Sequence, residues 1–246
     1  MIGRELLDDP RADPAAVRCE LHDIGRLNVL FGGTRAVVRE LEQFFDMGKP
    51  EAGSGKSGAS WTLLDVGTGS GDIAIAAAAV ARRCGVDLKP VGVELNRTAA
   101  RLARGNGMHV VLGDGNALPF GPKSVDVVIA SQVLHHLPRE RAVRWIATVD
   151  GLARRVVVLA DLRRSGVAIV GVWAAALGLR MSRVTRHDAV VSLRRGYTKR
   201  EFDGMLREAG VPAVARCRPG FRIVAAWSPE ASSVVRRPLL RMTDNG

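Results

Sequence analysis

Residues 61–74 of this 246-residue chain read W-T-L-L-D-V-G-T-G-S-G-D-I-A, and this stretch decides the fold. The apolar run over 61–66 has the length and composition of a buried strand. Three glycines follow at alternate positions: Gly67, Gly69 and Gly71. The alanine-rich run over 72–83 then predicts a helix. A strand, a glycine turn and a helix in this order predict a ligand at the carboxyl end of the strand, against the helix N-terminus.

The rest of the chain continues this alternation of strands and helices. Another strand begins near Ser124, and the remaining strands are expected over 91–93, 108–112, 155–161, 213–217 and 222–227. The tight turn at Pro219-Gly220 makes the last pair of strands antiparallel. The pattern predicts an α/β protein with a Rossmann-like seven-stranded sheet, mostly parallel with an antiparallel last strand, and helices on both faces.

The chain divides into a main domain with additions at both ends. We expect an N-terminal helical arm or lid over 1–47, a flexible linker over 48–60, the main domain over 61–227 with a helical cap inserted over 162–196, and a tail over 228–246. Within the arm, residues 1–20 are expected to be loosely held. Two helices with a hinge at Gly32-Gly33 follow from residue 21.

The net charge of +11 is unevenly distributed. Residues 1–150 hold 18 basic and 18 acidic side chains, so the whole excess lies in residues 151–246. A basic half can serve nucleic acid, an anionic membrane surface or an acidic substrate. No aromatic residues interleave with the arginines to stack on bases, which disfavours nucleic acid. The apolar run over 167–179 is too short to span a bilayer, but it leaves contact with a membrane surface or a lipophilic substrate open.

The cysteines and the N-terminus favour a cytoplasmic location. Cys19, Cys84 and Cys217 lie far apart and form neither a metal-binding nor a redox spacing, so no metal is expected. The first ten residues, M-I-G-R-E-L-L-D-D-P, carry acids and have no apolar core, unlike a signal peptide.

Three further motifs follow the glycine turn. Glu94 ends the second strand about 23 residues beyond the last glycine, where an acidic side chain can accept hydrogen bonds from both hydroxyls of a ribose. The sequence G-D-G-N-A-L-P-F over 113–120 follows the third strand, and S-Q-V-L-H-H-L over 131–137 follows the fourth. Asp161 ends the fifth strand.

Together these motifs resemble the class I S-adenosylmethionine-dependent methyltransferases over residues 61–227. Asp65 before the G-x-G-x-G spacing, Glu94, the 113–120 motif and the exit of the fourth strand come in that family's order. The chain is more narrowly similar to the ubiquinone/menaquinone C-methyltransferase-like group, known as methyltransferase type 11. The similar segments are N-V-L-F-G-G-T-R over 28–35, Gly71-Asp72, and S-L-R-R-G-Y-T-K-R-E-F over 192–202. The cap sequence differs from that group.

The resemblance implies that the cofactor is S-adenosylmethionine and that Asp114 meets its adenine. The residues expected to bind it are Asp65, Gly67, Thr68, Gly69, Gly71, Asp72, Glu94, Leu95, Asp114, Gly115, Asn116, Ser131 and Gln132. One residue of the pair His135-His136 is expected to pack near the cofactor.

The methyl acceptor is expected to be a small phenolic, quinone-like or polyketide-like molecule, methylated on oxygen or carbon. Candidate catalytic residues are His187 with Asp188, His136, and Arg35 to hold an anionic oxygen together with Arg186 and Arg194. The fourth strand ends in S-Q-V-L and not in the Asn/Asp-Pro-Pro-aromatic run of enzymes that methylate base amines. Two alternatives stay open: a nucleic-acid or protein methyltransferase, which the basic half favours, and a cofactor-binding subunit without catalysis. The sequence does not predict the oligomeric state.

Overall fold

The computed structural model describes residues 5–47 and 60–229. Its centre is one seven-stranded sheet in the order β3-β2-β1-β4-β5-β7-β6. The strands are β1 (Ser60–Val66), β2 (Asp87–Glu94), β3 (His109–Leu112), β4 (Val125–Ser131), β5 (Ala153–Leu162), β6 (Arg216–Arg218) and β7 (Arg222–Trp227). β1 to β5 are parallel, and β7 runs antiparallel to both of its neighbours. The predicted Rossmann-like sheet is therefore confirmed.

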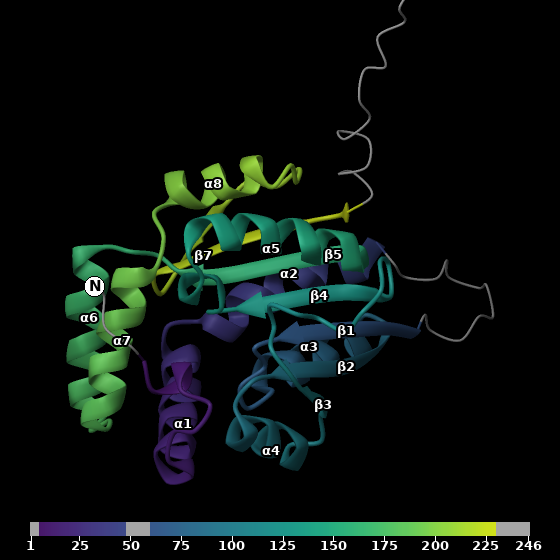
Figure 1. Ribbon diagram of the computed structural model, residues 1–246. Coiled ribbons are helices and arrows are strands. Elements are labelled where there is room, and N and C mark those ends of the chain that lie inside the picture. Colours follow the sequence, from purple (N-terminus) through teal and green to yellow (C-terminus); the bar gives the residue numbers. More distant parts are fainter. Residues whose placement is uncertain (1–4, 48–59, 230–246) are drawn as a thin grey trace, which may run out of the picture.

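Helices cover both faces of the sheet (Figure 1). α2 (Gly33–Met47), α3 (Asp72–Arg83) and α4 (Arg97–Gly105) pack on one face, where Leu41, Phe45 and Trp61 belong to one buried cluster. α5 (Arg139–Leu152) and α8 (Lys199–Glu208) cover the other face, with Trp145 and Phe202 in its cluster. The central strands are apolar on both sides, as parallel strands between two helical layers must be.

Three helices stand beyond the carboxyl ends of the parallel strands (Figure 1). They are α1 (Pro14–Leu30), α6 (Gly166–Gly178) and α7 (Arg183–Arg195). Leu27 of α1 and Ala176 of α6 share a small core with Met181. Two short 3-10 turns, η1 (Leu6–Asp8) and η2 (Leu134–His136), lie at the same end. No helix within 5–47 or 60–229 is long and apolar enough to cross a bilayer.

The N-terminal arm is more ordered than the sequence suggested. α1 begins at Pro14, and the Asp13 side chain caps it by accepting a hydrogen bond of 2.8 Å from Ala16 N. Val17 and Leu21 anchor this helix in a buried cluster. The hinge between α1 and α2 lies at Gly32, whose φ is +64°. Most of the linker expected over 48–60 and of the tail expected over 228–246 lies outside the described residues.

Candidate active site

The glycine loop adopts a conformation that only glycine accommodates readily. The φ angles of Gly67, Gly69 and Gly71 are +70°, +56° and +82°, all in the left-handed region. A Cβ on Gly67 would lie 2.7 Å from Val133 Cγ2. The loop therefore keeps its backbone bare at the end of β1, as close approach of a ligand requires.

Two buried side chains hold this loop from below. Thr68 Oγ1 donates a 2.7 Å hydrogen bond to Asp65 Oδ2. Burial raises the pKa of Asp65 to about 7, although the Thr68 hydroxyl opposes this rise. Asp65 is 3% exposed and is therefore buried beneath the loop. Its hydrogen-bond partner in the structure is the Thr68 side chain. Asp72 begins α3 directly after the loop.

Glu94 connects the glycine loop to the end of β2. Its Oε2 accepts a hydrogen bond of 2.9 Å from Gly69 N, and its Oε1 accepts one of 2.9 Å from Asn96 N. Burial raises the pKa of Glu94 despite these hydrogen bonds. The structure thus places Glu94 against the loop, and its binding of a ribose stays a prediction.

The segment after β3 lies at the outer end of the same edge. Asp114 is exposed, and its Oδ1 accepts a 2.8 Å hydrogen bond from Asn116 N. A Cβ on Gly115 would lie 2.8 Å from Val66 Cγ1, so this segment crosses close over the end of β1. Leu95 is 46% exposed beside it. Contact of these four residues with adenosine stays a prediction.

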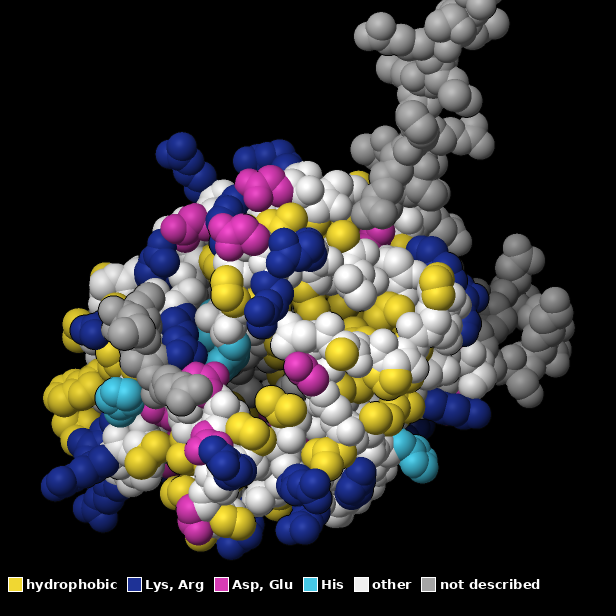
Figure 2. Space-filling model, in the orientation of Figure 1, with side chains coloured by type: hydrophobic (Ala, Val, Ile, Leu, Met, Phe, Trp, Pro, Cys, Tyr) yellow, Lys and Arg dark blue, Asp and Glu magenta, His cyan; other side chains and the backbone are white. Residues whose placement is uncertain are grey.

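A cavity of about 150 Å³ lies between the glycine loop and the helices beyond the strand ends. Its walls come from α1, the loop, the end of β4, α7 and the turn before β7. Figure 2 shows a hollow near the middle of this face, with histidine and acidic side chains around it. The polar side chains that line the cavity include Asn28, Ser131, Gln132, His135, His136, Asp188 and Arg222.

His135 and Asp161 form a buried pair at the cavity wall. His135 Nδ1 lies 2.7 Å from Asp161 Oδ1, and Asp161 Oδ2 accepts a hydrogen bond of 3.1 Å from His135 N. Burial alone would lower the pKa of His135, but the charges of Asp161 and Glu5 outweigh it and raise this pKa to about 9. The Tyr197 hydroxyl holds the turn by donating a 2.7 Å hydrogen bond to Leu134 O.

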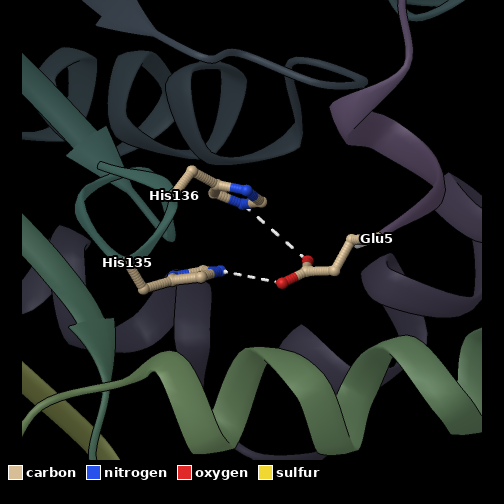
Figure 3. Close-up of side chains that lie close together, drawn as sticks. All are labelled: Glu5, His135 and His136. Atoms are coloured by element: carbon tan, nitrogen blue, oxygen red, sulfur yellow. Dashed lines mark ion pairs between the residues drawn. The ribbon is translucent and has the colours of Figure 1, made fainter. Parts of the chain in front are cut away.

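Glu5 approaches both histidines from the N-terminal arm (Figure 3). Its carboxylate oxygens lie 3.7 Å from His135 Nε2 and 3.8 Å from His136 Nε2. Three such groups within 4.8 Å could hold a metal ion. However, Arg195 Nη1 lies 3.0 Å from Glu5 Oε1 and 3.0 Å from Asp8 Oδ2, so an arginine already supplies positive charge there.

The catalytic candidates predicted from the sequence occupy different positions. His136 lines the cavity, and its Nδ1 lies 2.7 Å from Asp8 Oδ1. Asp188 also lines it, with Oδ2 accepting a 2.6 Å hydrogen bond from Leu6 N. The His187 side chain is 62% exposed and stands outside the cavity lining, yet its Nδ1 lies 2.9 Å from Asp188 Oδ1. Arg35 is exposed and also lies outside the lining.

Sequence reasoning left Glu5, Asp161 and Arg222 out of the predicted site. Asp161 carried a usable signal, because a carboxylate at the carboxyl end of a parallel strand lies at the ligand edge of the sheet. The signal at His135 was weaker, because the sequence does not show which residue of the pair His135-His136 faces the cavity. Glu5 and Arg222 carried no such signal in the sequence. Glu5 reaches the cavity from the N-terminal arm, and Arg222 reaches it from the antiparallel strand β7.

Comparison with known proteins agrees with this arrangement. Residues 64–150 match a family described as a methyltransferase domain. An uncharacterised methyltransferase of Mycobacterium avium (strain 104) is 43% identical over 89 residues, which are 36% of this chain and 34% of that protein. The match thus spans about a third of that relative's length.

Two solved structures have a similar fold at low sequence identity. A SAM dependent methyltransferase from Aquifex aeolicus gives a TM-score of 0.56 at 16% identity, over 88% of this chain and 98% of that chain. PigF with SAH gives a TM-score of 0.59 at 17% identity, over 91% of this chain and 62% of that chain. Residues 64–150 therefore match the methyltransferase domain family, and the fold around them is similar to that of these two solved structures.

Proposed function

We propose that this protein transfers a methyl group from S-adenosylmethionine to an oxygen or carbon of a small phenolic, quinone-like or polyketide-like molecule bound in the cavity. One observation carries the proposal: the glycine loop and His135 line the same cavity, and Asp161 contacts His135 beside it. The bare backbone of Gly67 and the carboxylate of Glu94 fit the cofactor. When bound, the cofactor supplies an activated methyl group on a sulfonium.

The task left to the chain is to align the acceptor, exclude water and accept a proton. His135 suits the last task in its neutral form, because its Nε2 then offers a lone pair; this atom is buried 3.7 Å from Glu5 Oε1 and has no hydrogen-bond partner among the described residues. Asp161 holds Nδ1–H and so fixes the tautomer in which Nε2 accepts a proton. The high pKa of His135 means that the neutral, proton-accepting form becomes more abundant as pH rises toward about 9.

The size and enclosure of the cavity favour a small acceptor. The cavity measures about 150 Å³ and also borders the glycine loop, where the cofactor is proposed to bind, so the space left favours a small acceptor. A nucleic-acid or protein substrate would have to present its acceptor atom past α1, η1 and α7, which enclose the cavity. The small-molecule acceptor is therefore the better-supported one.

The surroundings of the cavity support two further parts of the proposal. The outer face of α6 exposes Val167, Val170 and Trp173, which supports contact with a lipophilic acceptor or a membrane surface. No disulfide joins Cys19, Cys84 or Cys217, all of which lie within the described residues, and this supports work in the cytoplasm.

Methyl transfer can be tested with S-adenosylmethionine that carries a labelled methyl group. We would incubate the protein with a panel of phenols and quinols and measure label in the recovered acceptor. For an accepted compound assayed near pH 9, where about half of His135 is neutral, His135→Gln should lower kcat by about 10²–10⁴-fold, as expected for loss of a general base. His109→Gln is the matched control, because His109 is exposed at the start of β3.

The outcomes separate the competing functions. Cofactor binding without transfer to any phenol or quinol would support the non-catalytic alternative and contradict the proposal. Full activity of His135→Gln would leave the methyltransferase function intact but remove the proposed base. Loss of activity in His187→Gln would instead favour the His187–Asp188 pair predicted from the sequence.

A further inference from the structure

Arg222 is a buried cation whose hydrogen bonds are mostly unmade. It is the first residue of β7, it is 4% exposed, and it lines the cavity. Its Nη2 donates a 3.1 Å hydrogen bond to Asn28 Oδ1. Among the described residues its Nε and Nη1 have no hydrogen-bond partner, and no carboxylate forms an ion pair with it.

The structure around Arg222 holds it in place without neutralising it. Asn28 Oδ1 also accepts a 3.0 Å hydrogen bond from Gln132 Nε2, so side chains from α1, the end of β4 and β7 meet at one point. Gln132 adopts a left-handed backbone with φ of +59°, which few residues other than glycine adopt. A Cβ on Gly33 would lie 3.1 Å from Arg222 Nη2, so glycine at the start of α2 leaves the guanidinium room.

A guanidinium in this state calls for an anionic ligand. All its nitrogen groups are donors, so only acceptor atoms can satisfy those that are free. Burial lowers the pKa of Arg222 to about 10, which still leaves it cationic at neutral pH. Asp161 is the nearby negative charge that favours the cationic form of Arg222, but its oxygens accept hydrogen bonds from His135 N and Leu162 N. Because Arg222 is shielded from bulk water, its unpaired donors and an incoming carboxylate attract strongly.

We propose that the methyl acceptor carries a carboxylate group and that Arg222 binds it. The inference rests on the proposed function, and it narrows the acceptor to an aromatic or conjugated acid. His135 and Arg222 both lie beside Asp161, so the acceptor's reacting hydroxyl and its carboxylate have separate partners on one cavity wall. Arg222 is then the residue that sets specificity for an acid over a neutral ring.

Binding of two matched probes tests this without a known substrate. We would saturate the protein with S-adenosylhomocysteine at pH 7 and titrate it calorimetrically with 2,4-dihydroxybenzoate and, separately, with its neutral amide. The acid should bind about 10- to 100-fold more tightly than the amide, as expected for hydrogen bonds to a charged group. Equal affinities, or no binding of the acid, would overturn the proposal.

Variants then assign the preference to one residue. Arg222→Gln should abolish the preference for the acid, and Arg222→Lys should keep part of it because the charge remains. Arg141→Gln, on the exposed side of α5, should behave as the wild type. A preference that survives Arg222→Gln would contradict the assignment.

The affinity for S-adenosylhomocysteine is measured first for each protein and separates the two proposals. If the wild type does not bind S-adenosylhomocysteine, the proposed function fails. If it binds S-adenosylhomocysteine but does not distinguish acid from amide, only this inference fails.

Discussion

The buried pair of His135 and Asp161 predicts a specific dependence of stability on pH. The pKa of His135 is about 9 in the folded protein, against 6.5 for an ordinary histidine. The folded state therefore holds a proton that the unfolded state releases between these two values. Because the folded pKa is the higher one, the stabilisation is fully present below pH 6.5 and is lost as pH rises through about 9.

The magnitude follows from the same shift. Each unit of pKa difference corresponds to about 1.4 kcal/mol, so the free energy of unfolding should fall by roughly 3 kcal/mol between pH 6.5 and 9 on account of His135. The side chain is 2% exposed, so solvent screens this interaction little. The perturbation is the double variant His135→Gln with Asp161→Asn, which replaces both charges with neutral groups and leaves neither unpaired.

The assay is urea unfolding followed by tryptophan fluorescence at several pH values and constant ionic strength. We expect the wild type to lose stability over pH 6.5–9 and the double variant to lose roughly 3 kcal/mol less. His109→Gln should keep the wild-type dependence. Identical pH dependence in the wild type and the double variant would refute the reasoning, because it would show that His135 is neutral in the folded protein.

Three further predictions concern the loop, the arm and the histidine cluster. Gly67→Ala should lower the free energy of unfolding by about 1–3 kcal/mol, because alanine is strained at a φ of +70° and its Cβ would meet Val133; denaturant unfolding measures this. Glu5→Gln should lower the pKa of His135 and so shift the rise of the pH–rate profile to lower pH; an unshifted profile would show that Glu5 does not act on His135. Because Arg195 already supplies positive charge beside Glu5, EDTA should leave methyl transfer unchanged; a loss restored by a divalent ion would mean that Glu5, His135 and His136 bind metal.

The sheet was predictable because its signals are local. Each parallel strand is an apolar run bounded by turn residues, and the glycines after β1 fix the turn whatever lies around them. The start of α1 carries a local signal too, an N-cap residue followed by a proline at Asp13-Pro14, although residues 1–20 are otherwise typical of a loosely held arm. Burial of Val17 and Leu21 against α4 decides in favour of the helix.

The cavity was less predictable because its residues come from distant parts of the chain. Glu5 meets Arg195 across 190 positions, and Arg222 meets Asn28 across 194. Such contacts depend on how the helices pack beyond the sheet, which periodicity does not specify. The His187–Asp188 contact is the opposite case: the two residues are neighbours in the sequence, and His187 Nδ1 lies 2.9 Å from Asp188 Oδ1.

The most direct test of the account is calorimetric titration of the protein with S-adenosylhomocysteine, on the wild type and on Glu94→Gln. Glu94 accepts hydrogen bonds at the loop, and its charge is expected to bind the ribose hydroxyls. We predict binding by the wild type and affinity about 10- to 100-fold weaker in the variant, as expected for loss of hydrogen bonds to a charged group. A folded wild type that does not bind, or a variant that binds equally well, would contradict a cofactor site at the ends of β1 and β2.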